Sequence, residues 1–347
     1  LGIGGFYPSR IRRSFLVNLS TIFTYFITFA QVLSVVHFAL ATTDLAKVSE
    51  ILLFSLTQVS FVNKLINFHL KSWKLADLDK TLERDVFTSV TEEEEQMLKT
   101  AFAKCQKILS VFLISCVFVT LMYGLAPLLD NITTGKKNYP FPGKFPFNPD
   151  DYYVPIFFAE VTAVGISAWN NGSMDCLFAK HAVIATTLCK ILRKRIGTII
   201  QNTEDGRIVE DKLKHCVIYY DEIISYVARI QRIYSYGVLI QFLCSGIVIC
   251  LTGFQLLVVS SKNGKIGLLL VYLTCMMIQL VLYCWYGHIL TEESNGITMA
   301  CYVINWHELK VTNQKMLIMI MERAKKPLGL QAMGVFRLNL FTLMKIL

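Results

Sequence analysis

The sequence predicts an all-α, polytopic membrane protein, a single domain over residues 1–347 with seven transmembrane helices, a cytosolic N-terminus and an extended cytosolic helical anchor. Of its 347 residues, 54% are hydrophobic and 17% are charged, whereas soluble proteins carry about 25% charged residues. Several uncharged apolar runs reach the roughly 20 residues that a helix needs to cross a bilayer. Basic residues are distributed unequally among the connecting segments. These observations argue against a soluble enzyme, a nucleic-acid-binding domain and a disulfide-rich secreted scaffold.

Apolar runs separated by polar stretches define the seven helices. We expect them at residues 14–43, 48–70, 92–129, 152–195, 210–261, 266–291 and 335–347. The first run holds no formal charge and is too long for the apolar region of a signal peptide. The last run is about 20 Å of helix, which is shorter than the roughly 30 Å of a bilayer core. Because the sequence also begins with Leu1 rather than Met, we expect a truncated piece of a longer protein.

Lys and Arg predict which segments face the cytosol. The N-terminal segment and segments 71–107, 189–232 and 287–334 carry 24 of these residues, against 6 in the segments that alternate with them. Since basic residues concentrate on the cytosolic side of membrane proteins, the N-terminus is predicted to be cytosolic. Segment 130–151 then forms an extracellular loop, and its Asn-Ile-Thr triplet makes Asn131 a candidate glycosylation site.

The cytosolic segments near 71–107, 189–232 and 292–334 are expected to form a helical anchor. Thr91 and Glu94 have the spacing of a capping box, which predicts a helix start that runs on into a membrane span. Apolar residues spaced three, four or seven apart follow residue 210, namely Leu213, Val217, Tyr220, Ile224, Val227 and Tyr234. This spacing predicts a helix packed against a partner helix. An amphipathic helix on the membrane surface is the alternative.

Charges inside the predicted spans are rare and informative, because a buried ion is usually paired or functional. Glu50 and Lys64 lie near the ends of the second span, where their side chains can extend toward the interface. Glu160 and Asp175 lie deeper in the fourth span. They indicate either a cavity open to water or ligand, or a network of hydrogen bonds between helices.

Aromatic and soft side chains gather toward the outer ends of the spans. Aromatic faces and Met adapt to many small apolar molecules with few directed hydrogen bonds. These residues are our ligand-binding candidates: Phe54, Thr57, Gln58, Phe61, Thr120, Tyr123, Gly124, Phe157, Val161, Gly165, Tyr272 and Met276. Plain packing between helices is the alternative for each of them.

The sequence contains none of the motifs that mark common enzymes or metal sites. It lacks H-E-x-x-H, G-x-S-x-G, a phosphate loop and G-x-G-x-x-G. Its ten cysteines show no C-x-x-C spacing and fall in apolar or cytosolic segments, so we expect small core residues rather than disulfides. We therefore predict no enzyme activity, no catalytic residue, no cofactor, no metal and no nucleic-acid partner.

The last third of the chain carries an ordered series of features. An aromatic-rich helix ends near Trp306, an apolar helix starts at Lys315, Arg323 precedes a proline by four residues, and a Gly-x-Phe turn follows at 334–336. Together with seven spans and a cytosolic N-terminus, this series resembles the C-terminal signature of insect odorant receptors. Gustatory receptors of the same superfamily are the alternative, and a G-protein-coupled receptor would require an extracellular N-terminus.

The resemblance implies a function that the residues alone do not. Members of the family form tetrameric, ligand-gated, non-selective cation channels in the plasma membrane of sensory neurons, in which a tuning subunit assembles with a co-receptor subunit. A small volatile organic ligand binds in the outer half of the bilayer, and the last helix lines the pore. The short segment between the fourth and fifth spans implies a tuning subunit. By the same resemblance, the subunit-interface candidates in the anchor are Tyr302, Trp306, Met316, Met319 and Arg323.

Overall fold

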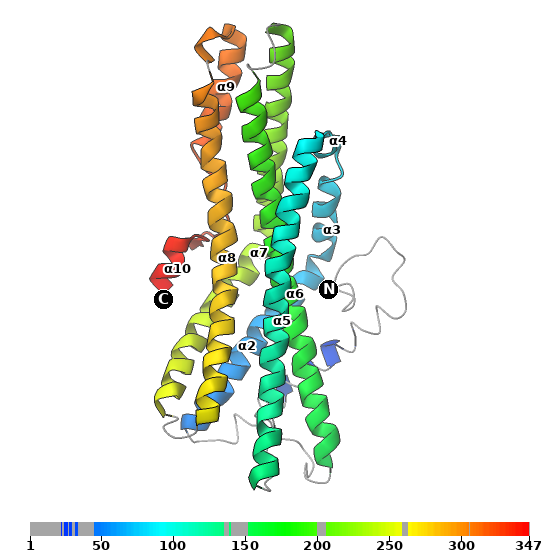
Figure 1. The fold of residues 1–347 in the computed structure, drawn as a ribbon, viewed down its shortest axis with the longest axis vertical. Coiled ribbons are helices and arrows are strands. Elements are labelled where there is room, and N and C mark those ends of the chain that lie inside the picture. The colour runs from blue at the N-terminus through cyan, green and yellow to red at the C-terminus, as the bar shows by residue number, and fades with distance from the viewer. Residues whose placement is uncertain are drawn as a thin grey trace. The chain divides into compact units, whose positions relative to one another are not determined.

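The computed structural model describes residues 45–134, 139, 152–199, 206–258, 263–304 and 306–346, with scattered positions between 22 and 33. The described chain is helical apart from one short hairpin (Figure 1). Its elements are α2 (Leu45–Leu70), α3 (Ser72–Thr81), α4 (Asp85–Thr88), α5 (Glu92–Thr134), α6 (Tyr153–Thr198), α7 (Gly206–Val258), α8 (Asn263–Val303), the 3-10 helix η2 (Trp306–Glu308), α9 (Val311–Ala324), β1 (Gln331–Ala332), β2 (Phe336–Arg337) and α10 (Leu340–Ile346).

The prediction of an all-α protein is confirmed, and the helices are longer than the apolar runs. α8 ends at Val303 rather than near residue 291, because Ile297 and Cys301 continue its buried face. α5 ends at Thr134, so Asn131 lies in a helix and not in a loop that begins at residue 130. Most of the helix expected at 14–43, and most of the loop expected at 130–151, lie outside the described residues.

The C-terminal segment differs from the expected helix at 335–347. Gln331 pairs with Arg337 across an antiparallel hairpin, and the helix starts only at Leu340. Gly334, with a φ of 77°, provides the left-handed backbone that the turn needs. The Asn339 side chain accepts a hydrogen bond of 2.7 Å from the Thr342 backbone and starts the new helix. Apolar composition alone therefore gave the wrong start for this helix.

The hairpin is held by polar contacts with α7. Gln231 accepts a hydrogen bond of 2.7 Å from the Gln331 backbone N–H and donates one of 2.5 Å to the carbonyl of the same residue. Next to the hairpin, Leu338 lies so close to Gly287 of α8 that a Cβ there would collide with the Leu338 carbonyl oxygen. A glycine at 287 is thus required for this close approach.

The chain divides into two compact units. Unit 1 comprises residues 1–73, 109–176 and 237–280, and unit 2 comprises residues 74–108, 177–236 and 281–347. Helices α5, α6, α7 and α8 each contribute residues to both units. Among the described residues, α2, α5, α7 and α8 each contain a stretch that is long and apolar enough to cross a membrane. α6 is of similar length, but Asn170, Asn171 and Asp175 make it more polar.

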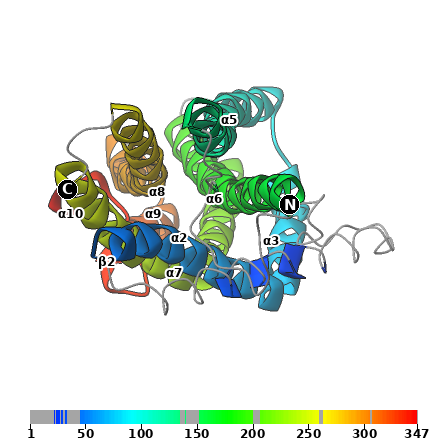
Figure 2. The same cartoon turned by 90° about the horizontal axis from the view of Figure 1, so that it is seen from below.

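Within unit 1, α2 lies beside α7 (Figure 2). Ser60 donates a hydrogen bond of 2.5 Å to the Gln241 side chain, and Gln255 donates one of 2.5 Å to Ser49 near the other end of the contact. Polar side chains thus hold these two apolar helices in one register, because each buried amide needs a partner at a particular position.

Within unit 2, the apolar stripe of α7 packs inside the protein. Leu213, Tyr220, Val227 and Tyr234 are buried, and the two remaining members of the stripe are half-buried. The prediction of a packed helix is therefore confirmed over that of an amphipathic helix on the membrane surface. The capping box is also confirmed, since the Thr91 backbone donates a hydrogen bond of 2.9 Å to the Glu94 carboxylate.

Candidate ligand-binding region and the polar groups around it

All twelve ligand-binding candidates lie in unit 1. They come from α2, α5, α6 and α8. The strongest link is between α5 and α8, where the rings of Tyr123 and Tyr272 meet edge to face with their centroids 6.0 Å apart. The Tyr272 hydroxyl lies beside Thr57 of α2. Thr57 itself donates to the Phe54 carbonyl over 2.8 Å. Three candidates from three helices are thereby brought together.

Two glycines bring α6 close to α5. A Cβ on Gly124 would lie 3.0 Å from a methyl carbon of Val161, and one on Gly165 would lie 4.0 Å from the Thr120 methyl carbon. Thr120 and Gly124 lie one helical turn apart on α5. Tyr123, which contacts α8, directly precedes Gly124. The α5–α6 contact is therefore continuous along the helix with the α5–α8 contact.

An apolar cluster adjoins the aromatic pair. Buried Leu53 of α2, Val248 of α7 and Met276 of α8 form its centre, and Tyr272 packs against them. This arrangement is suited to a small apolar molecule, because its walls offer methyl, thioether and aromatic surface with few fixed hydrogen-bonding directions.

Other candidates lie elsewhere in the packing of unit 1. Phe157 stacks with Tyr153 and Phe158 of its own helix, at centroid distances of 5.8 and 6.1 Å. Phe61 and Gln58 are buried on α2. Burial alone does not separate a ligand contact from helix packing, so these three residues remain predictions.

A buried ion pair lies in unit 1, and the prediction that Lys64 extends toward the interface is wrong. Lys64 does not extend toward an interface, since its ammonium donates over 2.5 Å to Asp175 and over 2.9 Å to the Asn171 side chain. The two charged side chains are only 4% and 2% exposed. A charge this far from solvent is tolerated only with a partner, which explains why Lys64 turns inward.

The ion pair belongs to a chain of polar contacts through four helices. Gln279 of α8 donates to the second Asp175 oxygen. Gln241 of α7 donates over 3.0 Å to Gln279 and accepts from Ser60 of α2. Of the two interpretations of Asp175, the hydrogen-bond network is therefore the one observed. Lys64 and Asp175 carry charges of opposite sign within the second and fourth apolar runs, which is a signal that could have suggested the pair.

The subunit-interface candidates lie at the end of α8, in η2 and on α9. Tyr302, Met319 and Arg323 are exposed, whereas Trp306 and Met316 are half-buried. α9 buries its opposite face, including Leu317 and Ile320. The helix thus leaves large apolar side chains on the surface of unit 2.

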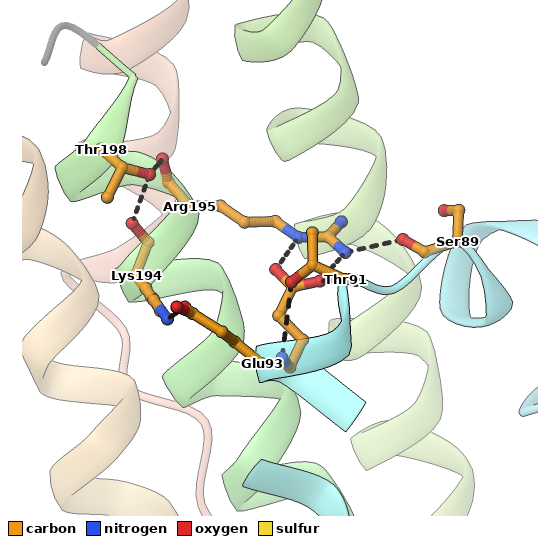
Figure 3. A network of polar contacts seen from close by, with 7 residues as sticks. Ser89, Thr91, Glu93, Lys194, Arg195 and Thr198 are labelled. Atoms are coloured by element: carbon orange, nitrogen blue, oxygen red, sulfur yellow. Dashed lines mark hydrogen bonds and ion pairs between the residues drawn. The ribbon is translucent and has the colours of Figure 1, made fainter. Parts of the chain in front are cut away.

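A separate polar cluster fastens the start of α5 within unit 2. The Arg195 guanidinium of α6 donates to both Glu94 oxygens, over 2.7 and 2.8 Å, and to the Ser89 carbonyl over 2.9 Å (Figure 3). Next to it, Lys194 pairs with Glu93. These acidic residues precede the apolar run of α5, which begins near residue 108.

The pairing shifts the pKa of both partners. Burial by itself raises the pKa of the Glu94 carboxyl, but hydrogen bonds from Arg195 and Thr91 outweigh it and hold the pKa below its ordinary value of 4.5. The hydrogen bond to Glu94 raises the pKa of Arg195. The pair is therefore ionised at neutral pH.

Unit 2 also contains an open cavity of about 420 Å³, which the sequence did not predict. It is lined by Met97, Lys190, Arg193, Lys194, Glu293 and Ala300. Arg193 donates over 2.6 Å to Glu293, and Lys190 lies 3.4 Å from the same carboxylate. Because three basic side chains and one carboxylate line this cavity, it is a poorer match to a small apolar ligand than the aromatic region of unit 1.

Comparisons with known proteins agree with this architecture. The family described as 7tm Odorant receptor matches residues 44–347. Odorant receptor 94a of Drosophila melanogaster is 27% identical over 205 residues, which cover 55% of this chain and about half, 53%, of that protein. Odorant receptor 46a, isoform A, of the same species is 22% identical over 323 residues, which cover 92% of this chain and 84% of that protein.

The fold is also that of a solved receptor. The olfactory receptor OR5 of Machilis hrabei in complex with eugenol superposes with a TM-score of 0.87 at 17% identity, covering 99% of this chain and 91% of that one. The structure of OR5 alone gives a TM-score of 0.86 at 16% identity. The family match extends over nearly the whole chain, so this chain belongs to the insect 7tm odorant receptor family, whose members are multi-pass membrane receptors and not enzymes.

Proposed function

We propose that the chain is the odorant-binding, tuning subunit of a ligand-gated, non-selective cation channel. Its ligand is a small, volatile, mainly apolar molecule. The observation that carries this proposal is the meeting of Thr57, Tyr123 and Tyr272 from three helices beside the Met276 cluster. An apolar ligand in such a region gains roughly 25 cal/mol for each Å² of apolar surface that it buries.

Gating requires that the ligand prefer one conformation over another. A ligand shifts a closed–open equilibrium only by its difference in affinity between the two states. The candidates lie on α2, α5, α6 and α8, so a change in how these helices pack would alter the ligand's contacts. The pore is proposed to be lined by the last membrane helix of the full-length subunit.

The topology belongs to the same proposal. Seven spans with a cytosolic N-terminus agree with the 24-to-6 distribution of Lys and Arg. An epitope tag at the N-terminus should be reachable by antibody only after cells are permeabilised. Labelling of intact cells would show that the N-terminus is extracellular and would contradict the proposed orientation.

The partner is proposed to be the co-receptor subunit, joined in a heterotetramer through the anchor. Exposed Tyr302 and Met319 support this, because large apolar side chains on a surface often mark a contact with another protein. Arg323 on the same helix would supply a polar rim.

The function is tested by co-expressing the full-length receptor with the co-receptor and recording current during application of volatile compounds. A cation current that appears without GTP is expected. Tyr272→Ala should raise the half-maximal ligand concentration by about tenfold, because it removes the ring between Tyr123 and the apolar cluster. Leu270→Ala, at an exposed position of the same helix, serves as the matched control. Strict dependence of the current on a G protein would reject the channel.

A further inference from the structure

Gln58, a buried glutamine of unit 1, lacks the hydrogen bonds that the other buried glutamines there have. Gln58 is only 6% exposed, and its Oε1 atom is buried without a hydrogen-bond partner among the described residues. It lies on α2 within a stripe of aromatic side chains, one turn after Phe54 and one turn before Phe61. A polar atom in such a place is normally bonded to protein, to water or to a ligand.

The other buried glutamines in the described part of unit 1 all have partners. Gln241 donates to Ser245 over 2.9 Å and to Gln279, Gln279 donates to Asp175, and Gln255 donates to Ser49. Hydrogen bonds within and between helices therefore give each of these three glutamines a partner. Gln58 departs from that pattern among the described residues, which leaves its Oε1 atom open to a bound molecule.

A second buried polar atom lies in the candidate region. The Tyr272 hydroxyl is buried and makes no hydrogen bond of good geometry with the residues that the structure describes. Its neighbour Thr57 uses its own proton for the Phe54 carbonyl. Thr57 directly precedes Gln58 on α2. Gln58 and Tyr272 thus lie on α2 and α8, two of the helices that contribute ligand-binding candidates.

The chemistry of the two atoms selects a ligand group. A carbonyl oxygen such as Oε1 only accepts hydrogen bonds, so its partner must donate one. Among small volatile molecules that are otherwise apolar, a hydroxyl is a neutral group that donates. A hydroxyl oxygen also accepts, so it could take a bond from the Tyr272 phenol. An ether, an ester or a ketone could satisfy only the phenol.

We propose that this receptor selects apolar molecules that carry one hydroxyl group, meaning aliphatic alcohols and phenols, through a hydrogen bond to the Gln58 side-chain carbonyl. The inference rests on the proposed function and narrows its ligand class. Apolar burial provides most of the affinity, and the hydroxyl decides between molecules of equal size. A hydrocarbon or ether of the same length leaves Gln58 without a partner, which a buried polar group disfavours.

The test uses matched ligands and a matched pair of variants. Octan-1-ol, heptyl methyl ether and nonane, which have equal chain length, are applied to the wild-type channel, to Gln58→Met, and to Val59→Ala at an exposed neighbouring position. The wild type and Val59→Ala should respond to the alcohol at about tenfold lower concentration than to the ether, the ratio expected from one hydrogen bond. In Gln58→Met that ratio should fall to about one, because Met keeps the side-chain length but cannot accept from a hydroxyl.

The outcomes separate the inference from the function on which it rests. Equal responses of the wild type to alcohol and ether would overturn the inference and leave the channel function standing, even if Gln58→Met failed to reach the cell surface. An unchanged ratio in Gln58→Met would mean that Gln58 binds only a fixed water, which also overturns it. Thermal unfolding of the purified receptor gives a readout independent of current: protection by the alcohol, lost in Gln58→Met, would support the inference even if no compound opened a pore.

Discussion

Units 1 and 2 differ in how many charged residues they hold and in how deeply their ion pairs are buried. Unit 2 holds 23 of the 34 Lys and Arg residues and 18 of the 25 Asp and Glu residues. Several of its ion pairs are partly exposed, such as Arg84 with Glu222. Unit 1 buries a pair, Lys64 with Asp175, almost completely. Exposed pairs contribute little to stability, whereas breaking a buried pair leaves an uncompensated charge. The unit with few charges therefore depends more strongly on each of them.

The largest effect is expected from breaking the pair in unit 1. Lys64→Met should lower the free energy of unfolding by about 3–5 kcal/mol, since it leaves Asp175 charged, buried and without its cation. Loss of surface expression and early thermal unfolding would report it. The double variant Lys64→Met with Asp175→Asn should recover most of the stability, because Asn still accepts from Gln279. A double variant as unstable as the single one would refute the role of charge.

A smaller effect is expected from Glu94 and Arg195, the most buried ion pair among the described residues of unit 2. Glu94→Gln should cost about 1–3 kcal/mol, because it removes the charge from a carboxylate that Arg195 holds at both oxygens. The adjacent Glu93→Gln is the matched control, and its 73% exposed side chain predicts a change within about 0.5 kcal/mol. Thermal unfolding of the purified protein measures both variants. Equal losses of stability in the two would contradict the expectation that the buried carboxylate matters more than the exposed one.

The contribution of Glu94 should depend on pH. Its folded-state pKa lies below the ordinary value of 4.5, so its stabilising effect is complete above that value and is lost as the pH falls through the lower, folded-state pKa. The difference in melting temperature between wild type and Glu94→Gln should therefore be constant from pH 7 to about pH 5.5 and shrink below pH 4.5. A difference that grew on acidification would contradict the sign of the shift.

The smallest effect is expected at the glycines of unit 1. Gly124→Ala should change stability by less than about 1 kcal/mol, because the gain in helix propensity opposes the close contact with Val161. Ligand sensitivity should change more than stability, since α5 would move away from α6 at the candidate region. Gly253→Ala, which meets no atom within 4 Å, should be neutral or stabilising and leave dose–response curves unaltered.

Much of the fold was predictable because its signals are local. Uncharged runs with helical length indicated the long helices, and Thr91 with Glu94 indicated where α5 begins. The hairpin at 331–337 was missed, because its apolar residues fit a helix as well as a strand and Gly334 was not weighed as a turn residue. The candidate list came from composition at the outer ends of the helices, which cannot tell Tyr272, in contact with two other helices, from Phe157, which stacks within its own.

The sequence by itself determined that the protein is helical and apolar, and where its charged residues lie along the chain, since these properties depend on neighbours within a few turns. Only the tertiary structure decided that Lys64 turns inward to Asp175, that Thr57, Tyr123 and Tyr272 meet, and that no described residue bonds the Gln58 Oε1 atom. Such pairings join residues more than a hundred positions apart. Helical periodicity tells which face of a helix is apolar, but not which helix that face will meet.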